Sequence, residues 1–221
     1  MMLPEFNAVI FDMDGLILDT ESSYFVAWQK AAEIMGYTLS HEFCVALSGS
    51  SFAMLEKELT VFFGKAFSFQ QFCELSTELW RNHVEENGIA VKFGVKELLF
   101  TLKKENITYC LATNSPEKSA RECLQYANID NLFELVICRD HVETPKPAAD
   151  LFLRAAEVLG QPIDKCLVVE DSYIGLLAAQ NAGAFSVLVP SLAVTEDMQR
   201  IANVVMDDLS FLSNAIKNLN N

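Results

Sequence analysis

The part of the chain that follows Gly88 alternates short apolar runs with helical segments, and this alternation constrains the fold more than any other sequence feature. Two strands joined through a helix are parallel, because the helix carries the chain back to the starting edge of the sheet. The sequence therefore predicts an α/β fold with a parallel sheet. The expected strands are residues 107–112, 134–138, 166–170, 185–189 and 203–206.

One further strand is expected near the start of the chain, at residues 8–11. Its sequence, Ala-Val-Ile-Phe, is the continuous apolar run that is typical of a strand buried on both faces. We therefore place it in the same sheet as the later strands. The expected core consists of residues 1–17 and 89–221.

The intervening residues 18–88 have a helical pattern and are expected to form an all-helical insertion. Apolar residues recur at helical spacing from Phe25 to Met35, and Gly36 follows as a C-cap. Two more helices are expected at about 51–63 and 69–87. The candidate hinges are residues 19–21 and 87–90.

Composition narrows the class of protein. The 221 residues are 51% hydrophobic, which is enough for a sizeable core and argues against disorder. A formal net charge of −14 argues against nucleic acid as a partner, since phosphate backbones are bound by clustered Lys and Arg. No apolar run approaches the roughly 20 residues that span a bilayer, and the first residues lack the features of a signal peptide. We expect a cytoplasmic protein without a membrane partner; the sequence leaves the oligomeric state open, and a monomer is compatible with it.

Cysteine and histidine do not indicate a metal site or a disulfide framework. The six cysteines are far apart, and Cys110, Cys138 and Cys166 lie in apolar runs, which favours buried free thiols. The three histidines have no i, i+4 partner and no nearby cysteine pair. Neither a histidine-based zinc site nor a Ser-His-Asp triad is expected.

Polar side chains follow four of the expected strands. In an open parallel sheet, ligands bind outside the carboxyl ends of the strands, so these side chains are expected to gather at one edge. They are Asp12 and Asp14 after the first strand, Thr113, Asn114 and Ser115 after the second, Lys146 in the loop after the third, and Glu170 at the end of the fourth with Asp171 and Ser172 after it.

Asp12 and Asp14 are two residues apart and are followed by Gly15. Side chains at this spacing in a strand point the same way, so their carboxylates crowd one another unless a cation or a phosphate group lies against them. Phosphoryl transfer from a monoester needs such a carboxylate nucleophile, a divalent cation, donors for the phosphate oxygens and an acid for the leaving group. The all-oxygen ligand set favours magnesium.

Each of these motifs also has a structural interpretation. Thr113 to Ser115 could cap the helix that begins near Glu117, and Glu170 with Asp171 could cap the helix that follows them. Lys146, between two prolines, could be a solvated turn residue. The joint placement of all four sets at strand ends favours a functional site.

These four motifs, in this order, resemble those of the haloacid dehalogenase superfamily. The resemblance covers essentially the whole chain and is to the branch that contains β-phosphoglucomutase and pseudouridine 5'-phosphatase. It implies a Rossmann-like phosphatase core, residues 1–17 and 89–221, with a helical cap domain, residues 18–88, that closes over the site. It also implies a phosphoric monoester hydrolase that uses magnesium and an aspartyl-phosphate intermediate.

The same resemblance implies a role for each site residue. Asp12 would be the nucleophile, and Asp14 would protonate the leaving alcohol and then activate water. Thr113 and Lys146 would hold the phosphate, with Asn114 beside them. The expected metal residues are Asp12, Asp14 through its main-chain carbonyl, Asp171, and Glu170 either as a ligand or behind the ligands.

Two departures from the mutase pattern favour hydrolysis of a small phosphorylated metabolite, of the sugar or nucleoside monophosphate type. The mutase has an arginine shortly after a glycine of the cap, where this chain has Ser50, Ser51 and Phe52, and Tyr24 replaces a histidine of its first cap helix. A second phosphate therefore has no obvious clamp. The alternatives are a phosphosugar mutase and a non-catalytic phosphate-binding module.

Substrate selection is expected to depend on the helical insertion. Aromatic residues on helices are usually part of a core, and this remains the default interpretation for Trp28. The candidate residues are Tyr24, Trp28, Ser48, Ser50, Ser51 and Lys57.

Overall fold

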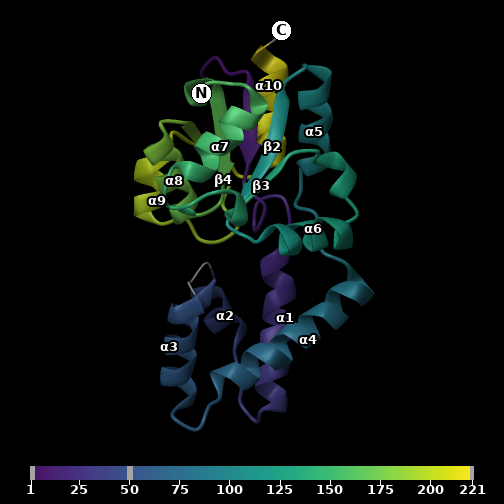
Figure 1. Cartoon of the computed structure of the whole chain (residues 1–221), viewed down its shortest axis with the longest axis vertical. Coiled ribbons are helices and arrows are strands. Elements are labelled where there is room, and N and C mark those ends of the chain that lie inside the picture. The colour runs from purple at the N-terminus through teal and green to yellow at the C-terminus, as the bar shows by residue number, and fades with distance from the viewer. Residues whose placement is uncertain (1–2, 49–51, 220–221) are drawn as a thin grey trace. The chain divides into compact units, whose positions relative to one another are not determined.

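The computed structural model describes residues 3–48 and 52–219 (Figure 1). The chain divides into two compact units, one of residues 1–19 and 90–221 and one of residues 20–89. Both boundaries fall inside the runs expected as hinges, one or two residues from the divisions expected after residues 17 and 88. The assignment of the two units as a phosphatase core and its cap stays a prediction.

The larger unit contains a parallel sheet, which confirms the predicted α/β, Rossmann-like fold. Its described strands pair in the order β3-β2-β1-β4-β5-β6, and every pair is parallel. The strands are β1 Ala8–Phe11, β2 Thr108–Thr113, β3 Val136–Cys138, β4 Cys166–Glu170, β5 Phe185–Leu188 and β6 Val204–Val205.

The position of β1 explains its sequence. It lies between β2 and β4, and all four of its residues are fully buried, as expected for an apolar run in the middle of a parallel sheet. From β1 the chain order runs outward through β2 and β3 on one side and through β4, β5 and β6 on the other. Such a reversal of strand order is where open α/β sheets bind their ligands.

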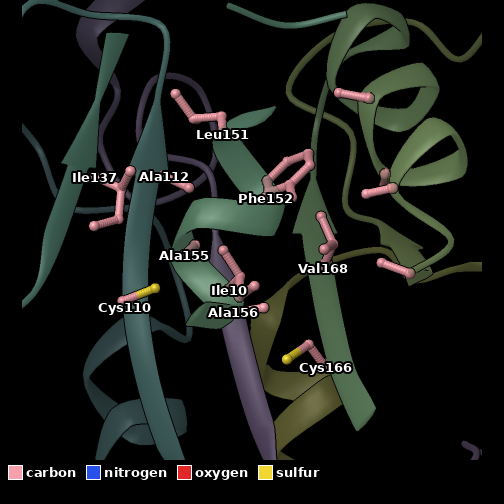
Figure 2. Packing of buried hydrophobic residues seen from close by; sticks show 14 of the residues in the cluster. Ile10, Cys110, Ala112, Ile137, Leu151, Phe152, Ala155, Ala156, Cys166 and Val168 are labelled. Atoms are coloured by element: carbon pink, nitrogen blue, oxygen red, sulfur yellow. The ribbon is translucent and has the colours of Figure 1, made fainter. Parts of the chain in front are cut away.

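One face of the sheet is covered by α7 (Asp150–Leu159) and α8 (Tyr173–Ala182), and Figure 2 labels residues of α7 and of the strands against which it packs. Small side chains on these helices allow them to approach the strands closely, and Phe152 fills the space that remains. The buried cluster consists of Ala8, Ile10, Cys110, Ala112, Ile137, Leu151, Phe152, Ala155, Ala156, Cys166, Val168, Ala178, Ala179, Ala182 and Ala184.

The other helices of this unit complete its packing. α5 (Val95–Lys104) packs against α10 (Leu209–Leu219), and a buried hydrogen bond of 2.9 Å joins the hydroxyls of Thr101 and Ser213. The remaining elements are α6 Glu117–Tyr126, α9 Glu196–Ile201 and the short 3-10 turns Asp130–Leu132, Arg139–His141 and Ile163–Lys165.

The smaller unit is all-helical in its described residues. Its helices are α1 Thr20–Ile34, α2 His41–Leu47, α3 Phe52–Phe63 and α4 Phe69–Asn87, and α1 packs against α4. Hydroxyls of Ser40 and Ser68 cap α2 and α4 at their N-termini. The unit has its own core of Phe25, Ala31, Ala32, Leu39, Cys44, Leu47, Leu59, Phe67, Phe69 and Phe72.

The observed elements differ from the expected ones mainly at their ends. Strand bounds shift by at most two residues, and α2 was not among the expected helices. This helix has only seven residues, of which Cys44 and Leu47 are buried. It is therefore too short to show a helical period of apolar residues. The six cysteines are free, as expected, and no helix in the described ranges is long and apolar enough to cross a membrane.

Candidate active site

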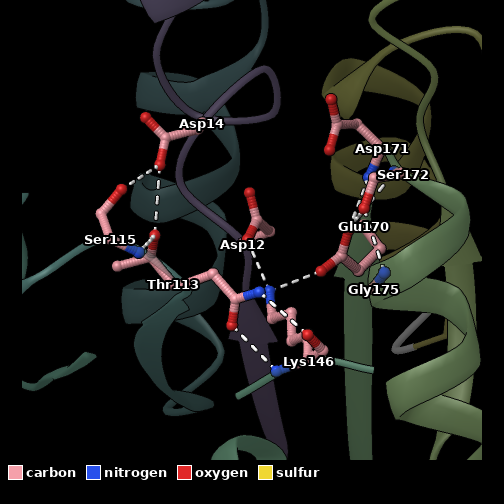
Figure 3. A network of polar contacts seen from close by, with 10 residues as sticks. Asp12, Asp14, Thr113, Ser115, Lys146, Glu170, Asp171, Ser172 and Gly175 are labelled. Atoms are coloured by element: carbon pink, nitrogen blue, oxygen red, sulfur yellow. Dashed lines mark hydrogen bonds and ion pairs between the residues drawn. The ribbon is translucent and has the colours of Figure 1, made fainter. Parts of the chain in front are cut away.

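The polar residues that follow β1, β2 and β4 meet at the carboxyl edge of the sheet, and Lys146 reaches the same place from the loop after β3 (Figure 3). The register explains why, since Phe11 at the end of β1 lies opposite Leu111 of β2 and Val169 of β4. Asp12 continues this pairing, because its N–H donates to the carbonyl of Val169 at 3.0 Å. Its carboxylate is therefore fixed at the centre of the edge.

Lys146 is buried between two carboxylates. Its Nζ donates to Asp12 Oδ1 at 2.5 Å and to Glu170 Oε1 at 2.6 Å, and only 3% of its side chain is exposed. The ammonium also lies 4.7 Å from the centre of the Phe152 ring. Both partners are buried as well, so the interaction is an ion triad inside the protein.

Burial lowers the pKa of Lys146, but its two carboxylate partners raise it by more, so its pKa lies above that of an ordinary lysine. Burial also raises the pKa of Asp12 well above its ordinary value; the ammonium opposes this shift, and the carboxylates of Glu170, Asp171 and Asp14 add to it. The lysine therefore offsets only part of the effect that burial and the neighbouring acids have on the pKa of Asp12.

Asn114 fixes the main chain of Lys146. Its Oδ1 accepts from the Lys146 N–H at 2.9 Å, and its Nδ2 donates to the Lys146 carbonyl at 3.2 Å. The two bonds tie the loop after β3 to the end of β2. Asn114 therefore fixes the main chain of Lys146, whereas the carboxylates of Asp12 and Glu170 fix the position of its ammonium group.

Asp14 lies apart from the ion triad and contacts two hydroxyls. Thr113 Oγ1 donates to Asp14 Oδ2 at 3.1 Å, and Ser115 Oγ donates to the same oxygen at 2.9 Å. Thr113 Oγ1 in turn accepts from the Ser115 N–H at 3.0 Å. The end of β2 thus provides two hydroxyl donors to one oxygen of this second acid.

Glu170 uses both of its oxygens within the protein. Oε1 accepts from Lys146, and Oε2 accepts from the N–H groups of Asp171 and Ser172 and from the Ser172 hydroxyl. The carboxylate is completely buried against α8, where a Cβ on Gly175 would lie 1.8 Å from its Cδ. Only glycine at this position leaves space for it.

Asp171 contacts the loops that follow β5 and β1. Its Oδ2 accepts from Ser191 Oγ at 2.6 Å, and a Cβ on Gly15 would lie 2.1 Å from the same oxygen. Gly15 also has a φ of +84°, a conformation that favours glycine. The glycine behind the two aspartates is therefore required by its backbone conformation and by the close approach of Asp171.

The arrangement of acids fits a divalent metal ion. One carboxylate oxygen from each of Asp12, Glu170 and Asp171 lies within 4.8 Å of the others. Three carboxylates and the ammonium of Lys146 leave a formal excess of two negative charges, which one dication neutralises. Oxygen donors without nitrogen or sulfur are typical ligands of hard cations such as magnesium.

The structure brings all seven predicted site residues to this edge of the sheet: Asp12, Asp14, Thr113, Asn114, Lys146, Glu170 and Asp171. Their individual roles stay predictions. Gly175 and Ser191 were not among the predicted residues, and Ser115 and Ser172 were predicted only as polar residues near strand ends. Ser191 could have been found by the same rule as the others, because it lies shortly after a strand, β5. Gly175 is an isolated glycine in a helical pattern, which indicates a close packing contact.

Three of the six candidates for substrate selection have partners within the helical unit. Tyr24 stacks on Trp80, with ring centres 5.1 Å apart, and contacts Trp28. The Ser48 hydroxyl donates to a carboxylate oxygen of Glu21. Ser50 and Ser51 lie outside the described residues.

Comparison with known proteins agrees with this geometry. A family model described as haloacid dehalogenase-like hydrolase matches residues 9–189. A Thermotoga maritima protein named phosphorylated carbohydrates phosphatase is 31% identical over 182 residues, which are 80% of this chain and 82% of that protein. A Bacillus subtilis β-phosphoglucomutase is 29% identical over 188 residues and 82% of each chain.

A solved structure shares the fold over nearly the whole length. It is a hydrolase from Pseudomonas syringae, 29% identical, and the superposition gives a TM-score of 0.74 over 96% of this chain and 99% of that one. The region matched by the family model, residues 9–189, includes all seven predicted site residues.

Replacement of Gly15 by alanine should destabilise the protein by about 2–4 kcal/mol, since it combines an unfavourable φ with a clash against Asp171. Gly160→Ala is the matched control, because Gly160 also has a positive φ, +66°, but has no atom within 4 Å of an added Cβ. The control should cost about 1–2 kcal/mol in urea unfolding. Equal losses in the two variants would mean that the contact with Asp171 is unimportant.

Gly175→Ala should destabilise the protein by about 1–3 kcal/mol through overpacking against Glu170. This effect on stability is opposite in sign to that at an ordinary glycine within a helix, where replacement by alanine stabilises the protein by about 1 kcal/mol. The same replacement in a Glu170→Ala background should therefore be stabilising. Urea unfolding of all four proteins measures the two effects, and a Gly175→Ala effect of the same sign in both backgrounds would contradict the contact.

Proposed function

The chain belongs to the haloacid dehalogenase-like hydrolase family and is a phosphoric monoester hydrolase, and on this premise we propose that it is a magnesium-dependent phosphatase of small metabolites. The reaction proceeds through an aspartyl-phosphate on Asp12. One observation carries the proposal: the Asp12 carboxylate is held by a buried lysine within a cluster of acids whose charge a dication would balance.

In the first step, a carboxylate oxygen of Asp12 attacks phosphorus, and the bond from phosphorus to the leaving oxygen breaks. The Asp14 carboxyl gives its proton to that oxygen, so the product leaves as a neutral alcohol. Lys146 and the Thr113 hydroxyl bind oxygens of the phosphoryl group, and Asn114 keeps Lys146 in place.

In the second step, the Asp14 carboxylate takes a proton from water, and the water oxygen attacks phosphorus. The bond between phosphorus and Asp12 breaks, which releases inorganic phosphate and restores both carboxyl groups. Asp14 is suited to this double role because it lies outside the ion triad, and its Oδ2 contacts neutral hydroxyls.

Magnesium, when bound, neutralises negative charge between the nucleophile and the phosphoryl group. Asp12, Asp171 and the main-chain carbonyl of Asp14 would hold it. We place Glu170 behind these ligands, because both of its oxygens already accept hydrogen bonds from the protein.

We infer that the substrate is a phosphorylated sugar or nucleoside monophosphate, which the residues of the helical unit select. The similarity to a phosphorylated carbohydrates phosphatase supports this class. We propose that the enzyme acts in the cytoplasm, since its free cysteines favour a reducing compartment, and that nucleic acid is not a partner, given the net charge of −14.

A phosphosugar mutase is the second candidate, because a β-phosphoglucomutase is among the similar proteins. Hydrolysis is favoured because Tyr24 replaces the histidine of the mutase, and the ring of Tyr24 stacks on Trp80. Efficient conversion of glucose 1-phosphate into glucose 6-phosphate in the presence of the bisphosphate would favour the mutase instead.

The direct test is the release of p-nitrophenol from p-nitrophenyl phosphate. We expect turnover with magnesium, none with a chelator, and inhibition by calcium, since calcium takes more ligands at longer distances and would draw Asp12 out of its attacking geometry. Full activity with calcium in the absence of magnesium would contradict the proposed metal dependence. No release under any condition would contradict the phosphatase itself.

Asp12→Asn should lower turnover by roughly a thousandfold or more, because the amide cannot form the phosphorylated intermediate. Without metal, the variant should be as stable as the wild type or more stable, since one of several repelling carboxylates is removed. Asp207→Asn makes the same charge change at an exposed position and is the control. A markedly lower melting temperature of Asp12→Asn in chelator would indicate a structural role for Asp12.

A further inference from the structure

Ser115 belongs to the network around Asp14 and has no role in the proposed reaction. Its hydroxyl donates to Asp14 Oδ2 at 2.9 Å, a shorter bond than the 3.1 Å bond from Thr113 to the same oxygen. Its N–H donates to Thr113 Oγ1. Ser115 therefore contacts both Asp14, the proposed proton donor, and Thr113, which would bind the phosphoryl group.

The number of hydroxyl protons limits what Thr113 can do. A threonine hydroxyl has one hydrogen, which here points to Asp14 Oδ2, while a lone pair accepts from Ser115. If Thr113 donates to a phosphate oxygen, as the proposed function requires, it can no longer donate to Asp14. Ser115 is then the hydroxyl of this network that still holds Asp14.

The contact also favours one orientation of the Asp14 carboxyl group. Ser115 donates to Oδ2 at 2.9 Å, so it can keep this orientation when the Thr113 hydroxyl turns to a phosphate oxygen. An acid that is held in this way needs no reorientation before it protonates a leaving group.

We propose that Ser115 is a positioning residue that orients Asp14 as the general acid while Thr113 binds the phosphoryl group. This inference rests on the proposed function and deepens it. It assigns the two hydroxyls at the end of β2 to different tasks, with Thr113 on the phosphoryl group and Ser115 on the acid.

The test is the dependence of kcat/KM on the leaving group, in a series from p-nitrophenyl phosphate to unsubstituted phenyl phosphate with magnesium. Nitrophenolate leaves without a proton, whereas a poorer leaving group needs the general acid, whose contribution is typically about 100-fold to 10,000-fold. Ser115→Ala should lose about tenfold or more with phenyl phosphate and less than about threefold with p-nitrophenyl phosphate, as expected for partial loss of that contribution. Inhibition by inorganic phosphate should not change.

Three single variants and one double variant make the result specific. Thr113→Val should lose activity equally along the series and should weaken inhibition by phosphate. Ser115→Thr keeps the hydroxyl and should restore the wild-type slope, and Ser119→Ala, a half-buried serine of α6, should behave as wild type. Adding Ser115→Ala to Asp14→Asn should cost nothing further, because Ser115 acts through Asp14.

If Ser115→Ala lowers kcat/KM equally for all esters, or weakens inhibition by phosphate, the assignment is overturned and Ser115 is a phosphate-binding or structural residue. A Ser115→Ala protein that does not fold would likewise show a structural role. These outcomes require an active wild-type enzyme. Absence of wild-type turnover on every ester would instead contradict the proposed function, and the role of Ser115 with it.

Discussion

The ammonium of Lys146 between the carboxylates of Asp12 and Glu170 is the interaction on which the rest of the site depends. A buried ion group is stable only when its geometry is tight and the remaining polar atoms have partners, because desolvation costs several kcal/mol per charge. The structure meets both conditions: Asn114 holds the main chain of Lys146 from both sides, and the absence of a side chain on Gly175 leaves space for the Glu170 carboxylate. The sheet supplies the positions, since β1 and β4 are adjacent and in register.

The charges around Asp12 also determine how readily its carboxyl group ionises. Within the ion triad one lysine meets two acids, and the neighbouring Asp171 adds a third carboxylate within ligand distance. This excess of negative charge raises the pKa of Asp12 when no cation is bound, after the effect of burial itself. A dication would remove the excess and favour the ionised form of Asp12, the proposed nucleophile. Oδ2 of Asp14, the proposed acid-base group, instead accepts from neutral hydroxyls, so the two aspartates on either side of Met13 have different environments.

The sequence was sufficient to predict the parallel sheet and most of the site, because both follow from a local rule. A fully buried parallel strand is a continuous apolar run, and the first polar residues after it must lie at the ligand-binding edge. Asp12, Thr113 and Glu170 were found in this way, and so was Lys146, although it lies several residues into a loop; only its role came from the family resemblance. Sequence patterns mark Gly175 and Ser191 but do not give the residues that they contact, because these contacts depend on tertiary packing: Gly175 lies against Glu170 at the start of α8, and Ser191 reaches Asp171 from the loop after β5. The helix α2 was missed for a different reason, its short length.

The central claim is that these carboxylates converge to hold one divalent cation against Asp12. Calorimetric titration of the metal-free protein with magnesium tests it most directly, and it needs no knowledge of the substrate. We predict saturable binding of a single ion per chain, with an affinity that falls by about tenfold or more in Asp171→Asn, since an amide replaces a charged ligand. The absence of saturable binding, or an unchanged affinity in Asp171→Asn, would contradict the account.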